Sequence, residues 1–141
     1  MTRNEIAALF ERRLDATTRL DAALLASLHS MDGIVESPFV GGVVQGRAAI
    51  EQAYTTFFRA FADLRIWQQD LLIDGDRAGI LVRMDGTNHG GLMGLPPTER
   101  SFSLSMASLC EFRDGLIARE RRIYDFTGLL TQIGAVKVKP A

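Results

Sequence analysis

The sequence predicts a single α+β domain over residues 1–141, in which helices come first and a meander of long antiparallel strands follows. The prediction depends on a change of period. Up to residue 61, apolar residues recur mainly at helical spacing, with a short hairpin over residues 33–44 as the exception, and from residue 64 onward they recur at a spacing of two. With 47% hydrophobic residues the chain can bury its own core, and no repeat or linker divides it. A curved sheet wrapped around so few helices should leave a conical apolar hollow.

Helical periodicity indicates three helices in the first half of the chain. Thr2 and Glu5 have capping-box spacing, and the apolar residues after them recur on one face, which predicts a first helix. A second helix is expected with a threonine of residues 17–18 as its N-cap and with His29 near its end, where a histidine interacts favourably with the helix dipole. A third helix is predicted over residues 47–61.

Strand signals occupy the rest of the chain. Residues 33–44 are apolar but interrupted by a proline and a glycine pair, which favours a short, bent hairpin. Two long strands are predicted over residues 64–73 and 78–85, around a tight turn. Alternation is clearest over residues 100–112, and an Asp-Gly turn then predicts a last strand over residues 116–125.

Two connections could shape the hollow. The segment 86–98 is too long for a tight hairpin, and its apolar side chains, Met93 among them, favour a flap formed by residues 90–97 over a pocket mouth. At the end of the last strand, Asp125 precedes a short helix. A carboxylate at such a junction either caps the helix or points into a cavity, where the loss of water raises its pKa and makes it usable as an acid.

Composition excludes several classes of function. Formal net charge is −1, and an acid interrupts the basic run at residues 119–122, so we expect no nucleic-acid partner and interpret these arginines as a solvated or subunit-facing strand surface. Cys110 is the single cysteine and no Cys and His cluster has zinc spacing, which predicts a reducing interior without a metal. No apolar run approaches the ~20 residues that cross a bilayer, so we expect no membrane partner and a cytoplasmic location.

Four groups of residues resemble the SnoaL-like polyketide cyclases of the nuclear-transport-factor-2-like superfamily. They are Glu36-Ser37-Pro38-Phe39, Gly46-Arg47-Ala48-Ala49-Ile50, Gly86-Thr87 followed by Gly94-Leu95-Pro96-Pro97-Thr98, and Asp125 with Gly128-Leu129-Leu130-Thr131-Gln132-Ile133-Gly134. The resemblance covers nearly the whole chain. It implies an α+β cone with an apolar cavity for a small or polycyclic ligand, and a homodimer formed through the outer sheet face.

The resemblance also implies a chemistry. In the cyclases, an aspartate at the place matched by Asp125 acts as general acid and base in an intramolecular aldol closure, with no cofactor. Related sequences often have a histidine directly after the Gly-Thr pair, whereas this chain has Asn88 there and the histidine at His89. Asp125, Asn88 and His89 are therefore the candidate catalytic residues, and a small apolar carbonyl compound is the implied substrate.

Three alternatives stay open. Ketosteroid isomerases are similar around Ser37, but a serine cannot abstract a proton unaided, and Glu36 would point away from a cavity that Ser37 faces. Epoxide hydrolases of the superfamily resemble Arg83 and Asp85, which share a strand face, although their second aspartate falls on Arg122. A non-catalytic small-molecule binding module is favoured by the displaced histidine and by Ser37.

Seven residues are candidates for the pocket wall. They are Ser37, Tyr54, Phe58, Trp67, Arg83, Asp85 and Met93. The aromatic stripe of the third helix is more simply explained as core, since such a stripe holds a helix to a sheet. The hydroxyl of Tyr54 is the one group in this stripe that could orient a substrate carbonyl.

Overall fold

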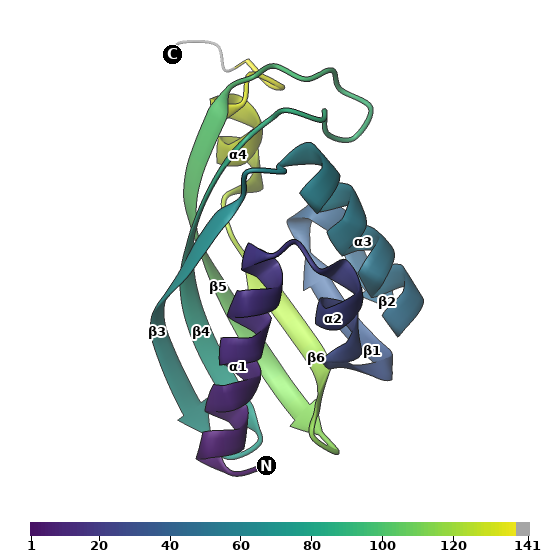
Figure 1. The fold of residues 1–141 in the computed structure, drawn as a ribbon, viewed down its shortest axis with the longest axis vertical. Coiled ribbons are helices and arrows are strands. Elements are labelled where there is room, and N and C mark those ends of the chain that lie inside the picture. The colour runs from purple at the N-terminus through teal and green to yellow at the C-terminus, as the bar shows by residue number, and fades with distance from the viewer. Residues whose placement is uncertain (138–141) are drawn as a thin grey trace.

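The computed structural model describes residues 1–137, and of Val40 the backbone alone. Helices precede a meander of long strands, as the sequence predicts (Figure 1). The helical elements are α1 (Arg3–Thr18), α2 (Ala22–Ser27), the 3-10 turn η1 (Pro38–Val40), α3 (Arg47–Ala60) and α4 (Phe126–Gln132). The strands are β1 (His29–Ser37), β2 (Gly42–Gln45), β3 (Arg65–Asp74), β4 (Arg77–Thr87), β5 (Ser101–Arg113) and β6 (Leu116–Ile123). Within residues 1–137, no helix is both long and apolar enough to cross a membrane.

The strands form one six-stranded sheet in the order β2-β1-β6-β5-β4-β3. All neighbouring strands are antiparallel except β1 and β6, which pair in parallel. The hairpin predicted over residues 33–44 is present as β1 and β2, although β1 already begins at His29. No turn joins two parallel neighbours, so the sequence carries no local signal for the β1 and β6 pairing. This pairing brings the first half of the chain against its last long strand.

The helix boundaries follow from side-chain caps. The capping box of α1 is confirmed, since the Glu5 amide donates to Thr2 Oγ1 at 3.1 Å and the Thr2 amide donates to Glu5 Oε2 at 2.7 Å. Thr17 and Thr18 do not cap α2, because both belong to α1 and their hydroxyls donate back to carbonyls of that helix. The cap of α2 is Asp21, whose carboxylate accepts a backbone hydrogen bond at 3.0 Å.

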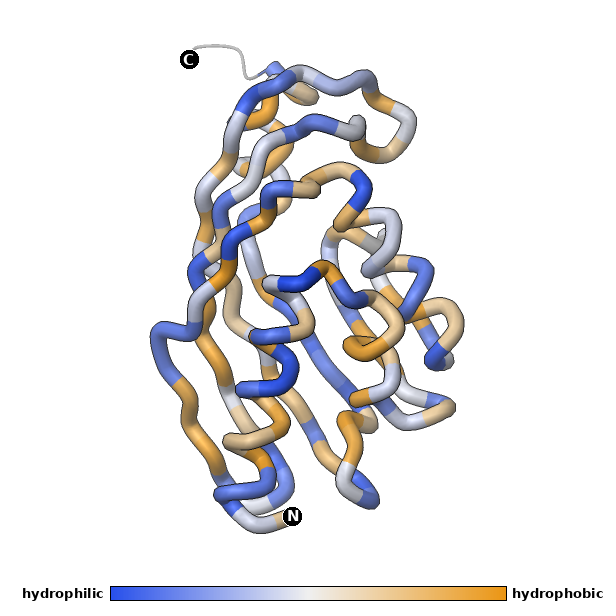
Figure 2. The backbone as a smooth tube through the Cα atoms, in the orientation of Figure 1, coloured by the Kyte–Doolittle hydropathy of each residue, from blue (hydrophilic) through white to orange (hydrophobic). Residues whose placement is uncertain are grey.

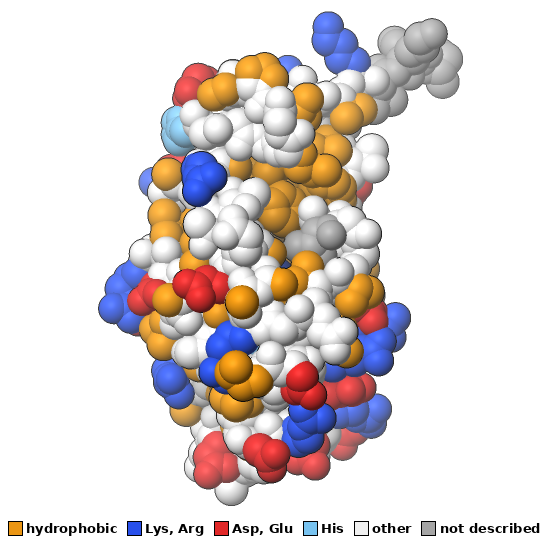
Figure 3. Space-filling model, turned by 90° about the vertical axis from the view of Figure 1, so that its right-hand side faces the viewer, with side chains coloured by type: hydrophobic (Ala, Val, Ile, Leu, Met, Phe, Trp, Pro, Cys, Tyr) orange, Lys and Arg blue, Asp and Glu red, His pale blue; other side chains and the backbone are white. Residues whose placement is uncertain are grey.

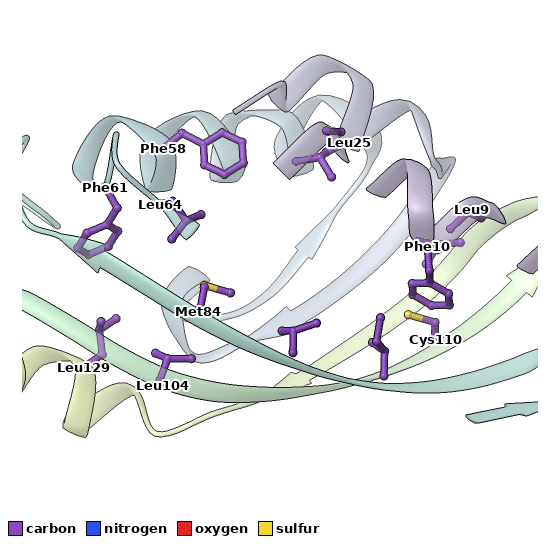
Figure 4. Packing of buried hydrophobic residues seen from close by; sticks show 14 of the residues in the cluster. Leu9, Phe10, Leu25, Phe58, Phe61, Leu64, Met84, Leu104, Cys110 and Leu129 are labelled. Carbon is purple, nitrogen blue, oxygen red and sulfur yellow. The ribbon is translucent and has the colours of Figure 1, made fainter. Parts of the chain in front are cut away.

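The core lies between the sheet and the helices α1, α2 and α3, which cover one of its faces (Figure 1). Figure 2 shows apolar and polar residues alternating along much of the long strands, the pattern expected where one sheet face packs on a core. Phe10 of α1 lies against Cys110 of β5, and Phe58 of α3 belongs to the same cluster as Met84 and Leu104 of the strands (Figure 4). Full burial of each such apolar side chain stabilises the fold by roughly 1.5–3 kcal/mol. Cys110 is a buried free thiol on the inward-facing side of β5.

Candidate active site

An apolar cavity lies between the helices and the concave face of the sheet. Phe10 from α1, Phe57 and Phe58 from α3, and Leu104 and Met106 from β5 are among the residues that line it. About 90 Å³ of its volume can hold the centre of a water-sized molecule. By that measure one water needs roughly 10–15 Å³, so the cavity has room for several waters or for part of a small organic molecule. Figure 3 shows apolar side chains gathered in a hollow on the side of the molecule that α3 occupies in Figure 1.

Three of the predicted wall residues line this cavity: Ser37 at the end of β1, and Tyr54 and Phe58 on α3. Glu36 points to the opposite face of the sheet, where it pairs with two arginines of β6. The parity predicted for this pair is therefore correct. The resemblance to ketosteroid isomerases would place their base at Ser37, and a serine hydroxyl alone does not supply that function.

Trp67, Arg83 and Asp85 lie outside the cavity, on the convex face of the sheet. Arg83 and Asp85 alternate with the cavity-lining residues of β4, and Trp67 is the cross-strand partner of Arg83. Arg83 Nη2 donates to Ser103 Oγ at 2.6 Å, and that hydroxyl donates to Asp85 Oδ1 at 2.6 Å. Arg83, Ser103 and Asp85 form a cross-strand network that does not face the cavity, so the epoxide hydrolase alternative loses its geometric basis.

The loop between β4 and β5 holds Asn88 and His89, the two candidate catalytic residues that follow the Gly-Thr pair. Asn88 is fully buried. Its Nδ2 donates to Thr98 Oγ1 at 3.1 Å, and its Oδ1 accepts from the Gly91 amide at 3.0 Å. Both ends of the Asn88 amide therefore brace the loop. His89 is exposed, with its Nδ1 2.5 Å from Glu99 Oε2, and neither residue lines the cavity.

The predicted flap, residues 90–97, contributes no residue to the cavity wall. Met93 is 60% exposed, whereas Leu92 is buried in the core cluster. Gly90 approaches the end of α3 so closely that a Cβ there would lie 2.0 Å from the Arg59 carbonyl oxygen, so only glycine fits. The loop is thus fastened to α3 and to the core.

Asp125 takes the capping alternative. Its side chain is exposed, and its Oδ1 accepts a hydrogen bond from the Gly128 amide at 2.8 Å at the start of α4. Strand β6 already ends at Ile123, and the next residue, Tyr124, lines the cavity in place of Asp125. A Cβ on Gly128 would lie 2.2 Å from Asp125 Oδ2, so the glycine leaves room for the cap. The desolvated position expected for this carboxylate is not found, and its acid/base role stays a prediction.

A charge cluster of Arg13, Glu120 and Arg122 forms one end of the cavity, with Glu120 buried and the two arginines partly buried. Arg13 and Arg122 line the cavity, and both bind the carboxylate of Glu120, which is fully buried. Arg122 Nε and Nη2 each lie 3.0 Å from a Glu120 oxygen. Burial disfavours the ionised carboxylate, but the two guanidinium groups outweigh burial and hold the pKa of Glu120 well below its usual value. All three side chains are therefore ionised at neutral pH.

His29 lies beside the charge cluster without adding charge to it. Its Nε2 is 3.9 Å from Glu120 Oε1, and its Nδ1 has no hydrogen-bond partner among residues 1–137. Burial lowers the pKa of His29 to about 3, although Glu120 partly opposes the shift, so the imidazole is neutral. His29 directly follows Leu28, the C-cap of α2, so its predicted place near a helix end is found, although it already opens β1. The predicted dipole interaction is wrong, because the neutral imidazole carries no charge.

Tyr54 connects the charge cluster to the apolar part of the cavity. Its hydroxyl oxygen accepts a hydrogen bond from Arg122 Nη2 at 2.5 Å, and Arg13 Nη2 lies 3.5 Å from the same oxygen. The hydroxyl hydrogen of Tyr54 is then free to donate to a ligand. Ser108, which is buried and lines the cavity, has a hydroxyl with no partner in the part of the chain that the structure describes.

The sequence does not single out this cluster, and the solvated or subunit-facing surface that it predicts for residues 119–122 holds for only half of them. Arg119 and Arg121 do lie on the outer face, but Glu120 and Arg122 face inward. Strand alternation was the available signal, since only every second residue can face solvent when the other face is covered. Guanidinium and hydroxyl donors at the end of an apolar cavity can stabilise negative charge on a substrate oxygen. Across residues 1–137, no group of three or more His, Cys, Asp or Glu side chains is placed to hold a metal ion.

Comparison with known proteins identifies a sequence family and several solved structures that this chain resembles. A sequence profile of the SnoaL-like polyketide cyclase family matches residues 8–133. A search of curated proteins finds no match.

Similar solved structures show the fold. TsrD from Streptomyces laurentii is 26% identical, with a TM-score of 0.85 over 96% of this chain and 99% of TsrD. AclR from Streptomyces galilaeus is 22% identical, with a TM-score of 0.83 over 99% of this chain and 91% of AclR. A protein with a ketosteroid isomerase-like fold from Catenulispora acidiphila, in complex with trimethylamine, is 21% identical, with a TM-score of 0.74 over 89% of this chain and 92% of that one. The chain has the α+β fold of the nuclear-transport-factor-2-like and ketosteroid isomerase-like proteins.

Proposed function

This chain belongs to the SnoaL-like polyketide cyclase family, and on that premise we propose that it is a cyclase-type enzyme, which closes a ring by an intramolecular aldol reaction without a cofactor. The proposed substrate is a small apolar carbonyl compound that binds in the cavity. One observation carries the proposal: the Tyr54 hydroxyl lines an apolar cavity while the partly buried guanidinium of Arg122 donates to its oxygen at 2.5 Å. Cytoplasmic location and the absence of a nucleic-acid partner stay predictions.

The reaction needs a site for negative charge. A carbon next to one carbonyl group loses a proton to solvent water, the resulting enolate carbon bonds to a second carbonyl carbon, and the alkoxide so formed takes a proton back from solvent. The closure is therefore an isomerisation, with no net gain or loss of atoms. Negative charge moves onto the second carbonyl oxygen as the bond forms, and donors already aimed at that oxygen lower the barrier. We assign this role to Tyr54, supported by Arg122.

Asp125 is the other candidate for proton transfer, from the family resemblance. In this geometry its carboxylate would have to leave the Gly128 amide and reach a cavity that it does not line. We therefore assign Asp125 the role of helix cap and expect it to contribute to stability more than to turnover. Loss of an N-cap costs about 0.5–2 kcal/mol.

Turnover of simple dicarbonyl compounds tests the assignment. A panel of δ-diketones, from heptane-2,6-dione to aryl-substituted analogues, is incubated with the protein, and chromatography follows the cyclic hydroxyketones. Tyr54→Phe should lower kcat by ~10²–10³-fold, the range for loss of one oxyanion donor. Tyr124→Phe is the matched control, because Tyr124 also lines the cavity but makes no hydrogen bond to the charge cluster. Asp125→Asn should keep most of the wild-type kcat.

Three results would contradict these assignments. Equal rates for Tyr54→Phe and Tyr124→Phe would remove the oxyanion role of Tyr54. Loss of turnover in folded Asp125→Asn would return the acid/base role to Asp125. No acceleration over buffer for any member of the panel would contradict the cyclase proposal.

A binding module without catalysis is the second candidate. The carboxylate of Glu120 favours this candidate, because it already accepts hydrogen bonds from two arginines. It is therefore poorly placed to accept a proton from a substrate. Calorimetric titration with the same diketones separates the two candidates. Binding of the diketones without any ring closure would identify the binding module.

The convex face of the sheet supports the proposal of a homodimer. Leu81, Ala107 and Ile123 lie in one row across β4, β5 and β6, and Leu109 follows two residues along β5 on the same face. Leu109 is 54% exposed and Ile123 is 62% exposed. A contiguous apolar area on a sheet face is typical of a protein–protein contact. We propose that two copies of the chain cover this face for each other.

A further inference from the structure

The end of the cavity formed by the charge cluster carries more positive than negative charge. Arg13 and Arg122 contribute two cations, and Glu120 is the one carboxylate that pairs with either of them among residues 1–137. His29, beside them, is neutral. A buried charge without a counter-ion is costly, because the apolar surroundings cannot replace its hydration. The described residues thus leave one cation uncompensated at the cavity wall.

Donors at the same end of the cavity are unused. Arg122 Nε and Nη2 bond to Glu120 and Tyr54, but no hydrogen bond from Arg122 Nη1 is found among the described residues. Ser108 Oγ is buried without a partner. Ser108 and Arg122 are directly opposite each other on β5 and β6, and both line the cavity. Buried donors are almost always satisfied in folded proteins, so an unpaired one that faces a cavity points to a ligand atom.

We infer that the cavity binds an organic anion: an apolar ring system with one carboxylate, held by the guanidinium of Arg122 and the hydroxyl of Ser108. Arginine and a hydroxyl suit this group because a carboxylate accepts several charge-assisted hydrogen bonds at once. The apolar body of the ligand would lie against the aromatic residues of α3. The inference rests on the proposed function only in using the same cavity, and it narrows the substrate class to carbonyl compounds that carry a carboxylate.

Calorimetric binding of three ligands of one shape tests the inference. The probes are 2-naphthoate, the neutral 2-naphthamide, and the cationic 2-naphthylmethylammonium. Wild-type protein should bind 2-naphthoate at least ~10-fold more tightly than 2-naphthamide, which corresponds to about 1.4 kcal/mol, and the cation most weakly. Equal affinity for naphthoate and naphthamide would overturn the inference.

The variant Ser108→Ala separates an effect on ligand binding from an effect on the stability of the fold. Because the Ser108 hydroxyl has no partner in the free protein, the substitution should leave the melting temperature unchanged or raise it. It should nevertheless weaken naphthoate binding at least ~10-fold, by loss of one hydrogen bond to a charged group. Ser105→Ala is the matched control, because Ser105 lies on β5 but is exposed on the outer face. Equal affinities of the two variants for naphthoate would contradict the proposed contact.

Arg122→Lys supplies a second, independent measurement. Lysine keeps the charge but lacks the planar fork of donors. Circular dichroism verifies that the variant is folded, and its naphthoate affinity should fall while its naphthamide affinity changes less. An unchanged preference for naphthoate in folded Arg122→Lys would count against the assignment. Failure here is distinguishable from failure of the cyclase proposal, because one assay measures binding of a non-reacting anion and the other measures ring closure.

Discussion

Glu120 accepts hydrogen bonds from the guanidinium groups of Arg13 and Arg122 and is fully buried at the inner end of the cavity. Each of these charges would cost several kcal/mol if it were buried alone. The position of Tyr54 depends on Arg122, and that of Arg122 depends on Glu120. Glu120 is therefore a positioning residue in our proposal, since it acts on a substrate only through the two side chains that it holds.

His29 predicts how stability depends on pH. Its folded-state pKa, about 3, lies below the usual value of 6.5, so the unfolded chain binds a proton more readily than the folded one. Stability is therefore lost as pH falls below 6.5, and the loss continues toward the folded-state pKa. Between pH 7.5 and 5.5 this one group should lower the free energy of unfolding by about 1.4 kcal/mol. Urea denaturation of wild type and His29→Leu at both pH values checks this, and an equal loss in the two proteins would show that His29 is not its source.

The interior of β6 shows why the charge cluster is hard to predict at the scale of an element. Ile117 faces the core opposite Phe112, whereas Arg119 pairs with Glu111 on the outer face, so β6 carries one extra residue at this point. Such a bulge reverses the side-chain parity. Counting in steps of two from Ile117 would place Arg119 inside and Glu120 outside. A bulge depends on tertiary pairing, so the sequence alone could not reveal which half of the run faces the cavity.

Elements defined by local chemistry were predictable from the sequence. The capping box predicts the start of α1, the apolar stripe predicts α3, and the alternation of apolar and polar residues predicts β5. The error at α2 has the same local origin, because Thr17 and Asp21 are both acceptable caps and only the length of α1 decides between them. At Asp125 the residues allowed either a cap or a cavity position, and the geometry shows the cap.

The loop between β4 and β5 supplies a prediction at the same scale. Asn88→Ala removes the buried amide that joins Thr98 and Gly91, so it should lower the free energy of unfolding by about 1–3 kcal/mol. The change should leave kcat on the diketones near the wild-type value in protein that remains folded. His89→Ala is the control, because His89 is exposed and its removal should change stability by less than about 0.5 kcal/mol. A loss of kcat in stable, folded Asn88→Ala would instead support the catalytic role that the family resemblance suggested.

At the scale of the whole molecule, the fold was more predictable than the site. Period and turn chemistry recur along the entire chain, so errors at single residues do not change the α+β architecture. The site depends on long-range placement: α1, β5 and β6 contribute Arg13, Ser108 and Arg122 to one end of the cavity. The family resemblance transferred one aspartate to Asp125, yet the structure places other polar residues at the cavity.

The convex face gives the prediction that concerns the molecule as a whole. If two copies cover this face for each other, light scattering should report twice the 15.5 kDa mass of the chain. Leu109→Arg places a charge inside the apolar row and should give a monomer, because an unpaired charge in a buried interface is costly. Met93→Arg, on the exposed β4–β5 loop, should remain a dimer and serves as the control. Trp67 also lies on the convex face, so its fluorescence should shift on dilution if it becomes exposed. A wild-type monomer at every concentration, or identical masses for both variants, would mean that the apolar face has another use.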